Sequence, residues 1–100
     1  MLLSDLAQVI RSKNAGPRRL TLDVMFATDA DYQRVAQSPA LSRAHIAALY
    51  RVPEDDVAVI PYPLGRAIKI TLPRDVVSGD VGDRDVYGAQ QHAPLLEIEL

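Results

Sequence analysis

The chain has 100 residues, of which 48% are hydrophobic and 24% are charged, and it contains no cysteine. A chain of this length builds one hydrophobic core, so we expect a single domain over residues 1–100. The formal net charge is −2 and the basic and acidic residues are interleaved, which argues against a nucleic-acid partner because phosphate backbones require a clustered positive field. The absence of cysteine excludes disulfides, thiolate nucleophiles and zinc-thiolate sites.

The N-terminal segment has neither a basic region followed by an apolar run nor a cleavage site, and no stretch approaches eighteen uninterrupted apolar residues. These features predict a cytoplasmic protein without a membrane span. The glycine-rich nucleotide-binding motifs and the G-x-S-x-G motif of hydrolases are also absent, so the sequence gives no support to nucleotide or hydrolase chemistry.

Two strands are predicted near the N-terminus. The apolar run Leu6 to Ile10 predicts a short strand, which the polar segment Arg11 to Pro17 ends because Gly-Pro breaks regular pairing. Residues Leu20 to Phe26 alternate between apolar and polar, the pattern of a strand with one face on a core.

Two helices are predicted next. Thr28 or Asp29 caps the first helix, which Pro39 stops, and Ser42 caps the second, which ends before Pro53. The apolar residues of both helices recur at the spacing of one helix face. They are Tyr32, Val35 and Ala36 in the first helix and Ile46, Leu49 and Tyr50 in the second.

The second half predicts two strands over Val57 to Tyr62 and Ala67 to Leu72, joined as a hairpin at the Leu64-Gly65 corner. No periodicity appears from Pro73 to Pro94, and residues 95–100 alternate again as a final strand. The resulting order, β-β-α-α-β-β-loop-β, favours an α+β fold with a mostly antiparallel sheet and two helices on one face.

The first polar segment is a candidate anion site. Arg11 can bind an anion with its planar fork and Lys13 adds a second positive charge, while the backbone N–H groups from Asn14 to Gly16 can form an anion-binding nest. The alternative is a solvated turn in which Asn14 and Gly16 supply unusual backbone angles.

The second polar segment, Asp85 to Pro94, concentrates a tyrosine, two amides and a histidine. His92 can act as an acid or base near neutral pH, and Tyr87 or Gln90 can orient a substrate. In the alternative interpretation, His92, Gln90 and Gln91 hydrogen-bond the loop to the sheet and no chemistry occurs there.

We expect no metal and no cofactor. Asp80, Asp83 and Asp85 lack the spacing and the terminal glutamate of a calcium loop and indicate turns. His45 has no second histidine or carboxylate at a metal-binding spacing, so it is interpreted as a helix-surface residue.

Four motifs resemble a bacterial family of about this length, catalogued as domain of unknown function 4387. They are Arg11 to Pro17, Leu20 to Phe26, Ala67 to Arg74 and Asp85 to Leu96. More distantly, the chain resembles the C-terminal ferredoxin-like domain of the acyclic terpene utilisation protein AtuA. The positions that match the two AtuA motifs are Arg11, Ser12, Gly16, Asp85 and Gly88.

The AtuA resemblance implies a ferredoxin-like sandwich that serves as the small accessory subunit of a larger AtuA-like protein chain, not an enzyme alone. In that role Arg11 and Lys13 would hold a carboxylate or the phosphate of a CoA thioester, and His92 with Tyr87 or Gln90 would contact the reacting end in a hydratase, dehydratase or lyase step. The remaining substrate-binding candidates are Ser12, Asn14, Gly16, Asp85, Gly88 and Gln91. The alternative is a non-catalytic module that binds a small anion or forms a homo-oligomer through its sheet.

Overall fold

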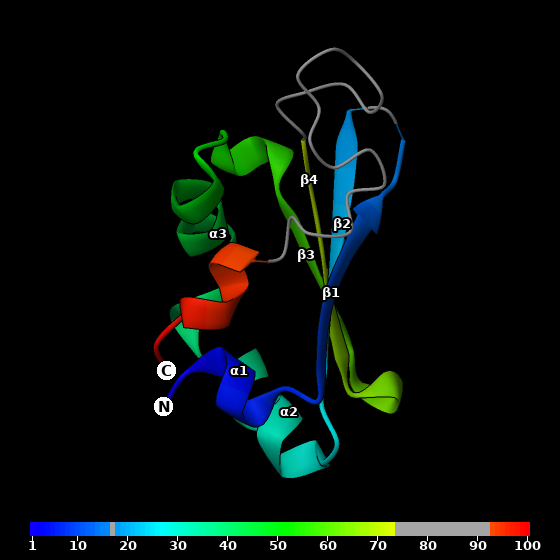
Figure 1. Ribbon diagram of the computed structural model, residues 1–100, viewed down its shortest axis with the longest axis vertical. Coiled ribbons are helices and arrows are strands. Elements are labelled where there is room, and N and C mark those ends of the chain that lie inside the picture. The colour runs from blue at the N-terminus through cyan, green and yellow to red at the C-terminus, as the bar shows by residue number, and fades with distance from the viewer. Residues whose placement is uncertain (17, 74–92) are drawn as a thin grey trace.

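Alternation of apolar and polar residues builds a four-stranded antiparallel sheet. The computed structural model describes residues 1–16, 18–73 and 93–100 (Figure 1). The strands are β1 (Val9–Asn14), β2 (Arg19–Met25), β3 (Ala58–Tyr62) and β4 (Ala67–Pro73), and their order across the sheet is β1-β2-β4-β3. Every neighbouring pair is antiparallel, as the sequence predicted.

The helices lie together on one face of this sheet (Figure 1). They are α1 (Leu3–Leu6), α2 (Asp29–Ala36) and α3 (Arg43–Tyr50), accompanied by the short 3-10 segments η1 (Pro39–Leu41), η2 (Glu54–Asp56) and η4 (Ala93–Glu97). The layers form an α+β sandwich, as the sequence predicted, and its sheet and two longer helices follow one another as β-β-α-α-β-β. No helix of the described residues is long and apolar enough to cross a membrane.

The core lies between the helices and the sheet. Leu22 of β2 and Ile70 of β4 are paired across the sheet, and both side chains are fully buried. From the helix layer, Tyr32, Val35 and Ile46 are buried against the same core. The periodic apolar positions predicted for both helices therefore include the residues that hold the two layers together.

Capping side chains begin the two longer helices where the sequence predicted. The Thr28 hydroxyl accepts a hydrogen bond from the Asp31 amide at 3.2 Å, and the Ser42 hydroxyl accepts one from the His45 amide at 3.2 Å. These contacts satisfy amides that have no partner inside the helix.

The prediction for the first strand was wrong in its boundaries. Leu6 ends α1, the strand begins at Val9, and Arg11 to Asn14 belong to β1 instead of a loop. Pairing with β2 over six positions keeps this polar segment extended. The Ala15 amide also donates to the Arg19 carbonyl at 3.0 Å, so the turn is shorter than the sequence suggested.

The predicted C-terminal strand was also wrong. Residues Ala93–Glu97 form the 3-10 segment η4, and only an isolated bridge pairs Glu99 with Leu2. Leu95 and Ile98 are spaced by three residues and both are buried, which one helical turn achieves and an alternating strand does not.

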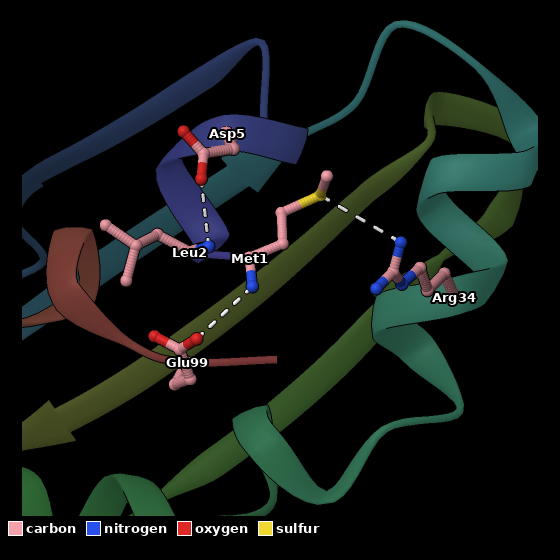
Figure 2. A network of polar contacts seen from close by, with 5 residues as sticks. All are labelled: Met1, Leu2, Asp5, Arg34 and Glu99. Carbon is pink, nitrogen blue, oxygen red and sulfur yellow. Dashed lines mark hydrogen bonds and ion pairs between the residues drawn. The ribbon is translucent and has the colours of Figure 1, made fainter.

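The C-terminal segment is held by the N-terminal one. The Leu3 amide donates to the Ile98 carbonyl at 2.8 Å, and the amino group of Met1 pairs with Glu99 at 3.2 Å. Figure 2 shows this pair together with the Asp5 carboxylate, which accepts from the Leu2 amide at 2.9 Å. The C-terminal end is thus tied into the helix layer and not into the sheet.

Arg66 fixes the hairpin between β3 and β4. Its backbone is left-handed, with φ of 49°, an unfavourable conformation for a residue with a side chain. Its guanidinium donates to Asp29 at 2.8 Å and to the Ala27 carbonyl at 2.9 Å. These bonds stabilise the turn η3 (Pro63–Gly65) against the loop that precedes α2.

A pair of leucine substitutions tests the position of the core. We expect Leu22→Ala to lower the free energy of unfolding by about 3 kcal/mol, because the fully buried side chain leaves a cavity. Leu64→Ala, at a fully exposed position of η3, should change it by less than about 0.5 kcal/mol. Urea unfolding measures both values, and equal losses would show that Leu64 is not exposed in the folded protein.

Tyr50 gives a pH test of the same core. Burial raises the pKa of its phenol above the ordinary value of 10.0, because the phenolate is poorly solvated inside the protein. Below pH 10.0 the phenol is protonated in both the folded and the unfolded chain, so the stability that the neutral Tyr50 gives is fully present. As the pH rises above 10.0 the unfolded chain ionises first, and the free energy of unfolding falls. Between about pH 8 and about pH 11, the urea midpoint should fall more for the wild type than for Tyr50→Phe; equal falls would contradict the assignment.

Candidate functional site

Alternation along β1 divides the predicted anion site between the two faces of the sheet. Arg11 and Lys13 lie opposite Asp23 and Thr21 of β2, on the face away from the helices. Ser12 lies opposite Leu22 on the helix side and is buried. Asn14, opposite the core residue Leu20, shares that side. The structure therefore brings Arg11 and Lys13 together and separates them from Ser12 and Asn14.

We call the sheet surface turned away from the helices the open face, because no helix or strand of the described residues lies on it (Figure 1). Residues directly opposite one another in antiparallel strands share a face, so the register defines its members. They are Val9, Arg11 and Lys13 on β1; Arg19, Thr21, Asp23 and Met25 on β2; Ala67, Lys69, Thr71 and Pro73 on β4; and Ala58, Ile60 and Tyr62 on β3.

Asp23 lies at the end of this face that carries Arg11, Lys13, Arg19 and Lys69, which we call the basic end. The register places Arg11 directly opposite Asp23 on one side and Lys69 on the other. The Arg11 Nε donates to the Asp23 Oδ2 at 3.3 Å, and the side chain of Asp23 is only 11% exposed against 57% for Arg11. The carboxylate thus holds the guanidinium against the sheet.

The open face is strongly basic for this chain. Among the described residues it carries Arg11, Lys13, Arg19 and Lys69 against one carboxylate, that of Asp23, which gives these five residues a net charge of +3 on a chain whose total is −2. Within the described residues Lys13 forms no ion pair. The arrangement can attract an anion and orient it with the planar Arg11 group.

Sequence reasoning missed Asp23, Lys69, Thr21 and Thr71 as members of this site. The sequence alone showed them only as polar positions that alternate with the apolar positions of two predicted strands. Their polar positions in the two alternating strands were visible, but only the register shows that they meet Arg11 and Lys13 on one surface.

The turn after β1 agrees only in part with the predicted anion-binding nest and only in part with the alternative, a solvated turn with unusual backbone angles at Asn14 and Gly16. Gly16 has φ of 130°, which glycine adopts readily, whereas Asn14 is an ordinary strand residue. Because the Ala15 amide donates to the Arg19 carbonyl, the nest of consecutive unpaired amides predicted for this segment does not form in full.

The second predicted segment is not described. Asp85, Tyr87, Gly88, Gln90, Gln91 and His92 lie outside the described residues, as do Pro17, Asp80 and Asp83. Their roles, and their proximity to Arg11, remain predictions. Among the described residues no group of three or more histidine, aspartate or glutamate side chains has a metal-binding arrangement.

Two clefts lie away from the open face. One, of about 240 Å³, is bounded by α2, η1 and β3, and its two serine hydroxyls already cap helices. The other, of about 460 Å³, is lined by His45 and Leu49 of α3 and by Pro94, Ile98 and Glu99. His45 is exposed on its helix, as predicted. The residues that line these two clefts include none of the open-face residues.

These features define a small α+β domain that presents one basic sheet surface. A family model described as Domain of unknown function (DUF4387) matches residues 3–99. The chain belongs to this family, as its motifs indicated. No curated protein and no solved structure matches the chain.

A double-mutant cycle tests the pairing of Arg11 with Asp23. Because Arg11 is more than half exposed, we expect a coupling energy of only about 0.5 to 1 kcal/mol between Arg11→Ala and Asp23→Ala. Urea unfolding of the wild type, both single variants and the double variant measures it, and added NaCl should reduce it. A coupling of zero at low salt would refute the pair.

Proposed function

We propose that this chain is a small accessory subunit of a larger AtuA-like catabolic enzyme, and that its open face contributes to a site for a carboxylate or acyl-CoA intermediate. The observation that carries the proposal is the position of Arg11 and Lys13 side by side on a surface of net charge +3. Arginine binds carboxylate and phosphate groups through two parallel hydrogen bonds, and lysine adds a point charge.

The hydrogen bond to Asp23 preorganises the Arg11 side chain for anion binding. By accepting from Nε, Asp23 restricts the motion of a long side chain, so less conformational entropy is lost when the terminal nitrogens bind an anion. Lys69 stands on the other side of Asp23 and keeps the surroundings of the carboxylate positive.

The exposure of these cations to water supports the accessory role. Arg11 is 57% exposed, and an ion pair in such contact with water is worth at most about 1 kcal/mol. A second chain that covers the open face would exclude water and strengthen each charge interaction severalfold. In this proposal the small domain supplies part of a site that the larger chain completes.

The same proposal assigns the chemistry to the second polar segment. His92, with Tyr87 or Gln90, would act as an acid or base at the reacting end in a hydration, dehydration or lyase step. This assignment is supported by the residue types in the sequence.

Binding of free CoA to the complex with the large chain tests the anion site. We expect the joint variant Arg11→Ala, Lys13→Ala to bind CoA at least about tenfold more weakly than the wild type, since two charge-assisted contacts are lost. Arg34→Ala is the control, because Arg34 is an exposed arginine of α2, away from the open face, whose guanidinium donates to the Met1 sulfur at 3.9 Å. Isothermal titration calorimetry measures the three affinities.

Three results would contradict the proposal in different ways. Equal CoA affinity in all three proteins would remove Arg11 and Lys13 from the site. Full affinity in the isolated chain would favour an independent anion-binding module. Failure of the wild-type chain to associate with the large chain would refute the accessory role.

A further inference from the structure

The open face has a second, apolar end that the anion site does not use. One row across the sheet consists of Val9, Met25, Ala67 and Tyr62. Beyond Tyr62 the hairpin tip η3 lies on the side of the sheet away from the helices (Figure 1). The exposed fractions are 38% for Val9, 48% for Tyr62 and 105% for Leu64, and Ile60, which pairs with Lys69 in the neighbouring row, is 40% exposed.

This end has no role in the core. Leu64 is fully exposed between Pro63 and Gly65, where a polar residue would serve the turn equally well. Contiguous exposed apolar side chains mark interaction surfaces in folded proteins. The tip is also held in place, because the guanidinium of Arg66, the residue that follows η3, donates to Asp29 and to the Ala27 carbonyl. The hairpin tip is therefore preorganised for contact.

Tyr62 connects the apolar end with the basic end. The ammonium of Lys69 lies 5.9 Å from the centre of the Tyr62 ring, within the range of a cation–π contact. An aromatic side chain with a positioned polar tip is typical of the residues that dominate binding energy at interfaces.

The charge distribution decides which kind of chain fits the open face. Two copies packed face to face about a twofold axis parallel to the strands would place the basic ends against each other. An axis across the strands would place the basic end of each copy on the apolar end of the other. In the first arrangement the positive charges of the two copies repel each other, and in the second the charged side chains are buried against an apolar surface. A second copy of the chain therefore does not complement the whole face.

We infer that the apolar end of the open face is the anchor by which this chain docks on a different protein. That protein presents an apolar pocket to Leu64 and Tyr62 and leaves Arg11 and Lys13 of the basic end for the anionic ligand, at the edge of the contact. The inference rests on the proposed function for the identity of the partner, the larger AtuA-like chain, and adds the surface through which the two chains meet.

Co-expression with the large chain tests the anchor. We expect Leu64→Asp to weaken the complex at least about tenfold, because a charge replaces an apolar side chain at the centre of the contact. Leu96→Asp is the matched control, since Leu96 is a leucine 37% exposed on η4 in the helix layer, and it should leave the affinity unchanged. Co-purification and surface plasmon resonance report binding, and thermal melting verifies that both variants fold. Tyr62→Ala provides a second variant without an added charge and should also weaken the complex.

The outcomes separate the two proposals. If the wild-type complex forms and Leu64→Asp and Tyr62→Ala bind as tightly as the wild type, the anchor is wrong while the accessory role stands. If no wild-type complex forms, the accessory role fails and the named partner with it. If light scattering shows a wild-type dimer that Leu64→Asp converts to a monomer, the occupant is a second copy and the inference is overturned.

Discussion

The pairing of β2 with β1 on one side and β4 on the other is the constraint on which the rest of the structure depends. Antiparallel register determines which side chains share a face, and a shift by one residue would exchange the two faces of a strand. Such a shift of β1 would turn Arg11 and Lys13 toward the buried residues Leu22 and Ile70. The cost of burying two unpaired charges therefore favours the observed register in addition to the apolar core.

The same register explains why one strand serves two purposes. On the helix side of β2, Leu22 and Val24 are fully buried in the core. On the other side Asp23 is nearly buried between strands that carry Arg11 and Lys69. A central strand receives neighbours on both edges, so even its outward residues are shielded, and a carboxylate there is retained because a cation contacts it.

Much of the fold was predictable because the strands β2, β3 and β4 and the helices α2 and α3 have clear periodicity and caps. The boundaries of β1 were not, because its core-facing positions include Ser12 and Asn14 and only pairing with β2 reveals the strand. The C-terminal run imitates a strand over six residues, too few to distinguish alternation from the single turn that buries Leu95 and Ile98. For the site, charge alone identified Arg11 and Lys13, whereas Asp23 and Lys69 required the register.

The two faces of the sheet differ in what they contribute to the fold. The helix side holds the core, and the short N- and C-terminal contacts of Met1 and Leu3 close the helix layer without using the sheet. The open face contributes little apolar burial, yet it carries both the basic cluster and the exposed Leu64. Leu64 is fully exposed, and the described residues of the open face carry a net charge of +3. A partner that covers both features at once accounts for them with one contact, because the apolar anchor supplies affinity and the covered cations gain strength from the exclusion of water.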